Sequence, residues 1–147
     1  MTEAKKILNM IENVDPSDTD TLDEIDARVW CWIRGIALDL APRDSGYKSP
    51  RISYMDNAGK LLRTDLYTRS RDALKAIRPD GWHWRINQLL EGKGWENGYI
   101  CVLTKTQLET TGRLNVIFVS GKNRVLPTQE LAELSATIQA INYERTR

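Results

Sequence analysis

The fold of this chain is decided by residues 67–84, which read YTRSRDALKAIRPDGWHW. A hydroxyl side chain, Thr68 or Ser70, can cap a helix over residues 70–78, because its oxygen accepts hydrogen bonds from the free amides of the first turn. The segment 79–81 begins with proline and ends with glycine, so it stops the helix and turns the chain. The stretch therefore predicts a short helix, a sharp turn and the start of a strand.

The predicted helix and strand each have a polar and an apolar side. Arg71, Lys75 and Arg78 fall on the wetter side of the helix, away from its apolar residues. After the turn, large apolar residues alternate with polar ones, which is the period of a half-buried strand. The apolar set, which we expect to pack in the core, is Trp82, Trp84 and Ile86.

The remaining elements follow from the same two periodicities. Apolar residues at helical spacing predict a first helix over 3–14 and a second helix that a capping box at Thr21 opens. A hairpin is predicted from 51–55 and 60–64. Further strands are expected at about 82–90, 99–104 and 114–120, and a last helix at 128–144 with Leu131, Leu134, Ile138 and Ile141 as its buried seam.

These elements predict an α+β fold in the order α-α-β-β-α-β-β-β-α. The expected architecture is an antiparallel sheet of three to five strands layered with helices. Residues 99–103 are a continuous apolar run, so both faces of that strand are expected to be covered. The length favours a single domain over 1–147, with an N-terminal helical extension at about 1–40.

Composition points to a soluble protein of the cytoplasm. The hydrophobic fraction is 41% and the formal net charge is +1, and no apolar run reaches the ~18 residues that a membrane span needs. The N-terminus has no apolar core typical of a signal peptide. Cys31 and Cys101 lie in apolar runs, which favours two buried thiols over a disulfide. The expected location is therefore the cytoplasm.

No catalytic constellation is visible, so we expect a protein that is not an enzyme. His83 is the only histidine, and its place in an alternating strand favours a solvent-facing side chain. A Cys–His nucleophile would require Cys31 or Cys101 to meet His83 through the fold. The chain has neither a Gly-x-Ser-x-Gly elbow nor a phosphate-binding loop. Catalytic residues, cofactors and metal ligands are therefore not expected.

Charge is unevenly distributed along the chain. Residues 15–26 carry six carboxylates, whereas residues 43–78 carry more basic than acidic side chains. These segments are either two solvated surfaces or surfaces that recognise a partner electrostatically. Trp95 lies in a glycine-rich loop, where its ring could stack on a base. The candidate binding residues are Arg63, Arg69, Arg71, Lys75 and Trp95.

Two motifs are similar to a known family. The patterns YTxSxDA at 67–73 and PxGWxW at 79–84 precede two strands and a helix that opens at Pro127 or Thr128. This arrangement resembles the small phage and prophage proteins grouped as the phage ABA-sandwich domain, over roughly residues 65–145. The resemblance implies a viral or prophage origin and a layered fold of helices and strands. It implies no particular chemistry.

The order of elements over the second half is also that of a double-stranded-RNA-binding domain. That family has a lysine cluster at the start of its last helix, where it binds phosphates. Here the corresponding residues, 128–133, include Glu130 and Glu133 and no lysine. This departure argues against RNA binding by that mode.

The first functional hypothesis is a non-enzymatic phage or prophage accessory protein that binds a host macromolecule, with a host protein or protein complex as the expected partner and inhibition of an antiviral defence as one role. The alternatives are a nucleic-acid-binding module that uses the basic region 43–78 and a protein that binds a small molecule or nucleotide. Homo-oligomerisation stays open, and no membrane partner is expected.

Overall fold

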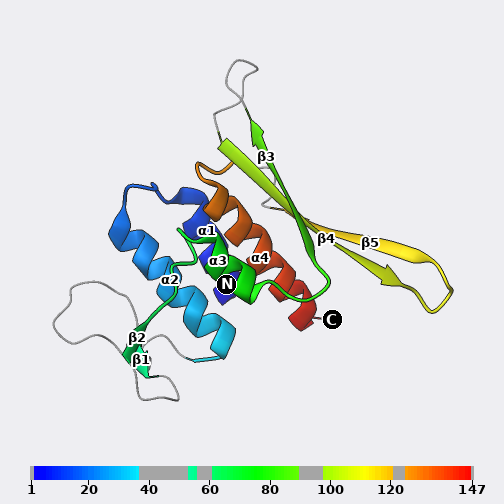
Figure 1. Ribbon diagram of the computed structural model, residues 1–147, viewed down its shortest axis with the longest axis horizontal. Coiled ribbons are helices and arrows are strands. Elements are labelled where there is room, and N and C mark those ends of the chain that lie inside the picture. Colours follow the sequence, from blue (N-terminus) through cyan, green and yellow to red (C-terminus); the bar gives the residue numbers. More distant parts are fainter. Residues whose placement is uncertain (1, 37–52, 56–60, 90–97, 121–124, 147) are drawn as a thin grey trace. The chain divides into compact units, whose positions relative to one another are not determined.

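The computed structural model describes residues 2–36, 53–55, 61–89, 98–120 and 125–146. Its elements follow the predicted order of helices and strands, which confirms the α+β fold (Figure 1). The chain divides into two compact units, Met1–Ser70 and Arg71–Arg147, and each is described by itself. The prediction of one domain over the whole chain stays a prediction.

The first unit contains two helices, α1 (Glu3–Asn13) and α2 (Thr19–Arg34), and a short antiparallel hairpin of β1 (Ser53–Met55) and β2 (Leu61–Arg63). The predicted hairpin is therefore confirmed; its turn, 56–59, lies outside the described residues.

The start of α2 differs from the prediction. Asp18 is the N-cap and its carboxylate accepts from the Thr21 amide, so the predicted cap at Thr21 is wrong. The Thr21 hydroxyl instead donates to Asp18 over 2.6 Å, because the charged oxygen is the stronger acceptor. At the other end, Gly35 has φ of 67° and closes the helix through the left-handed conformation that glycine adopts easily.

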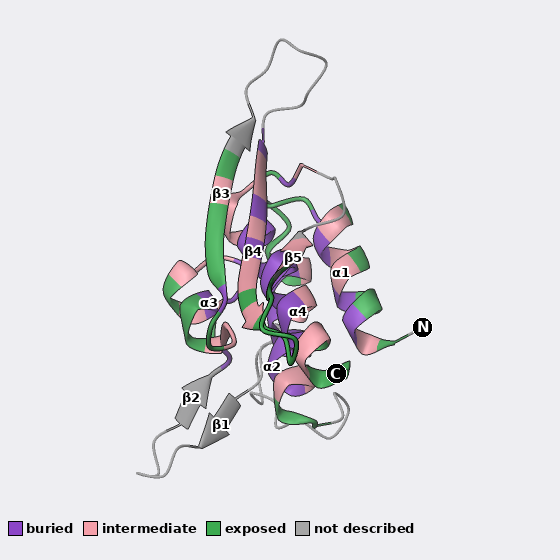
Figure 2. Cartoon of the chain, turned by 90° about the vertical axis from the view of Figure 1, so that its right-hand side faces the viewer, coloured by how far each residue is buried: buried purple, intermediate pink, exposed green. Residues whose placement is uncertain are grey.

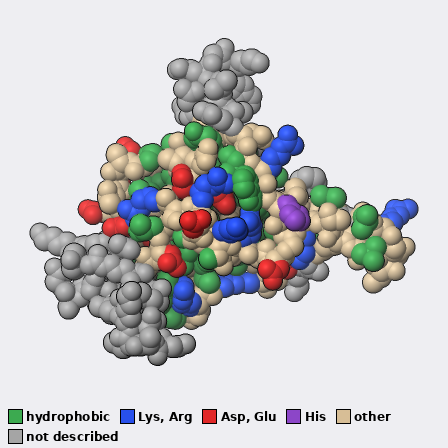
Figure 3. Space-filling model, viewed as in Figure 1, with side chains coloured by type: hydrophobic (Ala, Val, Ile, Leu, Met, Phe, Trp, Pro, Cys, Tyr) green, Lys and Arg blue, Asp and Glu red, His purple; other side chains and the backbone are tan. Residues whose placement is uncertain are grey.

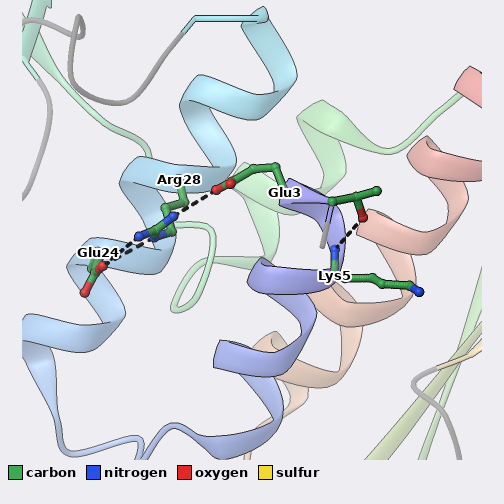
Figure 4. A network of polar contacts seen from close by, with 5 residues as sticks. Glu3, Lys5, Glu24 and Arg28 are labelled. Carbon is green, nitrogen blue, oxygen red and sulfur yellow. Dashed lines mark hydrogen bonds and ion pairs between the residues drawn. The ribbon is translucent and has the colours of Figure 1, made fainter.

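Helices α1 and α2 pack against each other through buried aliphatic residues. Ile7 and Ile11 lie four residues apart on α1, and Ile25 and Val29 are buried at the same spacing on α2. A polar link joins the same two helices (Figure 4). Arg28 Nη1 lies 3.0 Å from Glu3 Oε1, and Arg28 also pairs with Glu24 one turn earlier on its own helix.

The second unit is a three-stranded antiparallel sheet with two helices. Its strands are β3 (His83–Leu89), β4 (Gly98–Leu108) and β5 (Leu114–Ser120), in the spatial order β3-β4-β5. The helices are α3 (Arg71–Ile77) and α4 (Gln129–Thr146). Helix α4 packs mainly along β4 and also contacts α3 (Figure 1). Three adjacent antiparallel strands were predicted at these positions, and the prediction is confirmed.

Among the described residues, one face of the sheet is covered more fully than the other. Cys101 and Leu103 on β4 are buried, whereas Val102 between them is partly exposed. Figure 2 shows buried and partly exposed stretches alternating along β4. The face of β4 away from α4 is therefore covered only in part, so the prediction of two covered faces holds fully for one face. On β3, His83 and Arg85 are exposed on the face away from α4, so an apolar run on β4 sits beside polar residues of its neighbour.

The two predicted core tryptophans have different environments. Trp82 is 4% exposed, meets Tyr143 edge-on at 5.8 Å, and donates from Nε1 to Glu144 over 3.0 Å. Trp84 is 43% exposed, so its predicted burial is wrong. It lies on an edge strand, β3, while α4 covers mainly the central strand.

The last helix is buried on more than its predicted seam. Leu131, Leu134, Ile138 and Ile141 are buried as expected. Burial also includes the intervening residues Ala132, Glu133, Ser135, Ala136 and Thr137. Thr128 caps the helix by accepting from the Leu131 amide over 3.2 Å. The helix is thus buried over most of the stretch from Leu131 to Ile141, and its small side chains permit close packing.

Candidate functional site

The second unit contains a basic cleft beside α3, with a volume of about 320 Å³. We call it the α3 cleft, and its lining residues are Arg71, Asp72, Lys75, Arg78, Trp84 and Glu133. Three of these side chains are cationic and two are acidic, so the cleft has a small surplus of positive charge.

The cations of the cleft are brought together by helical spacing. Lys75 lies four residues after Arg71 and Arg78 lies seven after it, which places all three on one side of α3 and its last turn. The ammonium group of Lys75 is exposed and forms no ion pair with any described residue. Arg78 has a buried Nη1 atom with no hydrogen-bond partner in the described part of the chain. Among the described residues, Lys75 and Arg78 are therefore the two cations of the cleft that form no ion pair, whereas Arg71 pairs with Glu133.

Arg71 has a structural role at the base of the cleft. Its Nε donates to Glu133 Oε2 over 3.0 Å, and the Glu133 side chain is only 3% exposed. A buried carboxylate is stable only with a charged or hydrogen-bonding partner. The same guanidinium lies 4.5 Å from the ring centroid of Trp84, so one arginine holds both an α4 carboxylate and a β3 ring.

Trp84 provides the apolar part of the site. Its exposed surface borders the same cleft as Lys75 and Arg78. A flat aromatic ring beside cations can stack on a base or fill a pocket in a protein partner.

A second charged cluster lies in the first unit and is internal. Asp26 on α2 is fully buried, and its Oδ1 accepts from the Thr68 amide over 2.8 Å. Arg69 Nη2 donates to Asp26 Oδ2 over 2.8 Å and also to Asp23. Burial raises the pKa of Asp26 to about 6, against the opposing effect of Arg69 and Thr68. Thus α2 binds the segment that carries Thr68 and Arg69.

The structure separates the predicted binding residues. Arg71 and Lys75 lie together in the α3 cleft, whereas Arg69 pairs with Asp23 and Asp26 in the other unit. Arg63 is in β2 and only its backbone is described. Trp95 lies outside the described residues.

Sequence reasoning did not select Arg78, Trp84 and Glu133 as site residues. For Arg78 the signal was present, because it follows Lys75 at helical spacing on the wet side of the helix. For Trp84 the alternating pattern pointed to the core, and only the edge position of β3 explains its exposure. Glu133 comes from α4, so tertiary packing alone brings it to Arg71.

Because its cations outnumber its carboxylates, the α3 cleft is suited to binding anions.

The cysteines do not supply a reactive thiol. Burial raises the pKa of the Cys101 thiol to about 12, and the nearby Glu133 carboxylate adds to this rise, so the thiol stays protonated and is a poor nucleophile. Cys31 and Cys101 are both buried thiols, as predicted. Within the described residues, no three metal-ligating side chains come together. On the face drawn in Figure 3, basic and acidic side chains are interspersed, as they are in the cleft.

Comparisons with protein-family models, with curated proteins and with solved structures find no match for this chain. The resemblance to the phage ABA-sandwich domain therefore stays a prediction. No helix in the described residues is both long and apolar enough to cross a membrane.

Proposed function

We propose that this protein is a non-enzymatic binding protein of phage or prophage origin that recognises an acidic segment of a host protein through the α3 cleft. One observation carries this proposal: Lys75 and Arg78 line the same cleft as the exposed ring of Trp84. Tryptophan and arginine are the residues that most often dominate protein–protein binding energy. The motifs at 67–73 and 79–84 support the phage origin.

A protein partner fits the charge of the cleft better than a nucleic acid does. A typical nucleic-acid-binding domain has a strongly basic stripe or face. The α3 cleft combines its cations with Asp72 and Glu133, and the whole chain has a formal charge of only +1. A mixed site of this kind recognises a particular arrangement of charges, because misplaced like charges repel.

The matching experiment is affinity capture from a bacterial host lysate, followed by mass spectrometry. The test variant is Lys75→Glu with Arg78→Glu, and the control is Lys5→Glu with Lys6→Glu. The two variants change net charge equally, and the control residues are exposed on α1. A host protein that wild type and control capture, and that the test variant loses, supports the proposal. Equal capture by all three proteins would remove the cleft from the binding site.

A second candidate function is binding of single-stranded nucleic acid, which the exposed Trp84 ring favours. Stacking of one base on an aromatic ring contributes about 1–3 kcal/mol. The discriminating probes are a labelled oligothymidylate and a labelled polyglutamate peptide, measured by fluorescence anisotropy with the same variants. Tighter binding of the oligothymidylate, lost in Trp84→Ala, would put this candidate first.

Inhibition of an antiviral defence is the role we propose for the host-protein complex. It predicts that the captured partner belongs to such a defence and that co-expression of the wild-type chain lowers its activity. The variant Lys75→Glu with Arg78→Glu should leave the defence active. Capture of a partner with no part in defence would separate this role from binding itself.

A further inference from the structure

In the described part of the chain, the outer edge of β5 has no pairing strand. On one side, β5 forms an antiparallel ladder with β4, from the pair Leu108 and Leu114 to the pair Val102 and Ser120. On its other side, no described residue pairs with it. An edge strand of this kind presents a row of free amides and carbonyls that another strand can bind.

β5 also lacks the features that protect edge strands. Its sequence, LNVIFVS, has no charged residue, no proline and no glycine. The opposite edge of the sheet, β3, carries exposed His83 and Arg85, and charged side chains on an edge discourage pairing with other chains. The two edges therefore differ, and β5 is the one open to addition of a strand.

Apolar side chains border this edge on the face away from α4. Leu114 is 72% exposed and Val116 is 45% exposed, and Leu108, opposite Leu114 on β4, is 73% exposed. Exposed residues of this size close together mark an interaction surface more often than scattered single ones do. The surface and the free edge coincide on the same strand.

We propose that β5 pairs antiparallel with β5 of a second copy of this chain, which joins two three-stranded sheets into one. The occupant is a second copy, because two identical uncharged strands can pair about a two-fold axis without opposing like charges. A two-fold axis at Ile117, the middle residue of β5, places each residue opposite one of the same parity. The pairing keeps both faces of the sheet in register.

Charge supports the same occupant. Two uncharged strands meet without like-charge repulsion, and an acidic or basic peptide would gain no ion pair from β5 itself. Pairing would satisfy the free amides and carbonyls of both edges and cover part of Leu114 and Val116. This inference does not depend on the proposed function of the α3 cleft.

The test is sedimentation equilibrium of the full chain over a range of concentrations, with two lysine variants. Val116→Lys introduces a charge on the edge strand, and Thr106→Lys introduces the same charge on its cross-strand partner in β4, on the same face. Both positions are exposed. We expect a dimer for wild type, a dissociation constant at least about tenfold higher for Val116→Lys, and little change for Thr106→Lys.

Other results would overturn the proposal. A wild-type chain that stays monomeric at the highest concentration excludes β5 pairing. Equal weakening by Val116→Lys and Thr106→Lys indicates packing of sheet faces rather than of edges, and no weakening by either places the interface elsewhere.

A cross-linking experiment tests the geometry without relying on the folding of the lysine variants. Directly opposed residues of antiparallel strands have Cα atoms about 4.5–5.5 Å apart, within the reach of a disulfide. Ile117→Cys should therefore form a covalent dimer on oxidation. Leu114→Cys is the control, because its more exposed thiol favours random collision but lies off the proposed axis. More dimer from Leu114→Cys than from Ile117→Cys would contradict the pairing.

Discussion

The guanidinium of Arg71 lies over the ring of Trp84, 4.5 Å from its centroid, while its Nε atom donates to the buried Glu133. One side chain at the start of α3 thus contacts both β3 and α4. The ring is held in place by an interaction that leaves much of it exposed. A surface tryptophan fixed in this way is ready to bind without ordering a free side chain, which lowers the entropy loss on binding.

Arg71→Ala should destabilise the fold by roughly 2–4 kcal/mol, because it leaves the Glu133 carboxylate buried without its partner. Replacing both groups, as in Arg71→Met with Glu133→Leu, should recover most of the lost stability, since no buried charge remains. Urea unfolding of the single and double variants measures both effects. A double variant as unstable as the single one would show that the ion pair does more than neutralise Glu133.

Trp82→Ala should be far more destabilising than Trp84→Ala. Trp82 is buried and its loss leaves Glu144 with one donor fewer, so we expect a cost of roughly 3–5 kcal/mol. Trp84 is half-exposed and its truncation should cost about 1 kcal/mol, mainly from the lost contact with Arg71. Thermal unfolding midpoints of the two variants provide the comparison. A larger loss for Trp84→Ala would mean that the ring supports the sheet rather than a binding site.

The order and approximate limits of the elements were predictable because local signals determine them. The prolines at 79 and 127 and the alternation after Gly81 identify α3, β3 and α4 from a few residues each. The unequal burial of Trp82 and Trp84 was not predictable. This difference depends on which strand lies at the edge of the sheet. Periodicity tells which face of the sheet a residue is on, but not how far across that face the covering helix extends.

The candidate site was predictable only in part, for a similar reason. Arg71 and Lys75 were selected from charge and helical spacing, and both line the cleft. Arg69 was selected from charge alone, and it pairs with Asp23 and Asp26 far away in the sequence. The acidic segment and the basic segment therefore partly neutralise each other inside the first unit, which no linear charge pattern reveals.

The salt dependence of binding should separate the two partner classes proposed for the α3 cleft. If Lys75 and Arg78 neutralise phosphates, the logarithm of the binding constant falls with the logarithm of the salt concentration. Each phosphate contact adds about 0.7 to the steepness of that slope for a single strand, so Lys75→Glu should flatten it. An acidic protein segment should show a weaker dependence, because it releases no condensed counterions, and Trp84→Ala should weaken its binding at every salt concentration. Anisotropy titrations at several salt concentrations measure both. Lys5→Glu, an exposed change on α1, is the control and should leave the slope unchanged.

Ionisation of Asp26 should make the stability of the fold depend on pH. The folded-state pKa of Asp26 is raised from 3.8 to about 6, chiefly by burial. Between these values the folded chain binds the proton more tightly than the unfolded chain does. The contribution of Asp26 to the free energy of unfolding is therefore largest below pH 4, and falls by about 1–3 kcal/mol as the pH rises to 6.

Asp26→Asn should remove this pH dependence of stability. The asparagine side chain keeps an oxygen that can accept from the Thr68 backbone amide, but it does not ionise. Urea unfolding at several pH values, as the difference between wild type and variant, isolates the effect of this one carboxyl. Asp15→Asn is the matched control of opposite sign. Hydrogen bonds from Ser17, its backbone amide first, lower the pKa of the exposed Asp15, so its contribution should grow as the pH rises. If the Asp26→Asn and wild-type profiles run parallel between pH 4 and 6, the buried carboxyl does not titrate in this range.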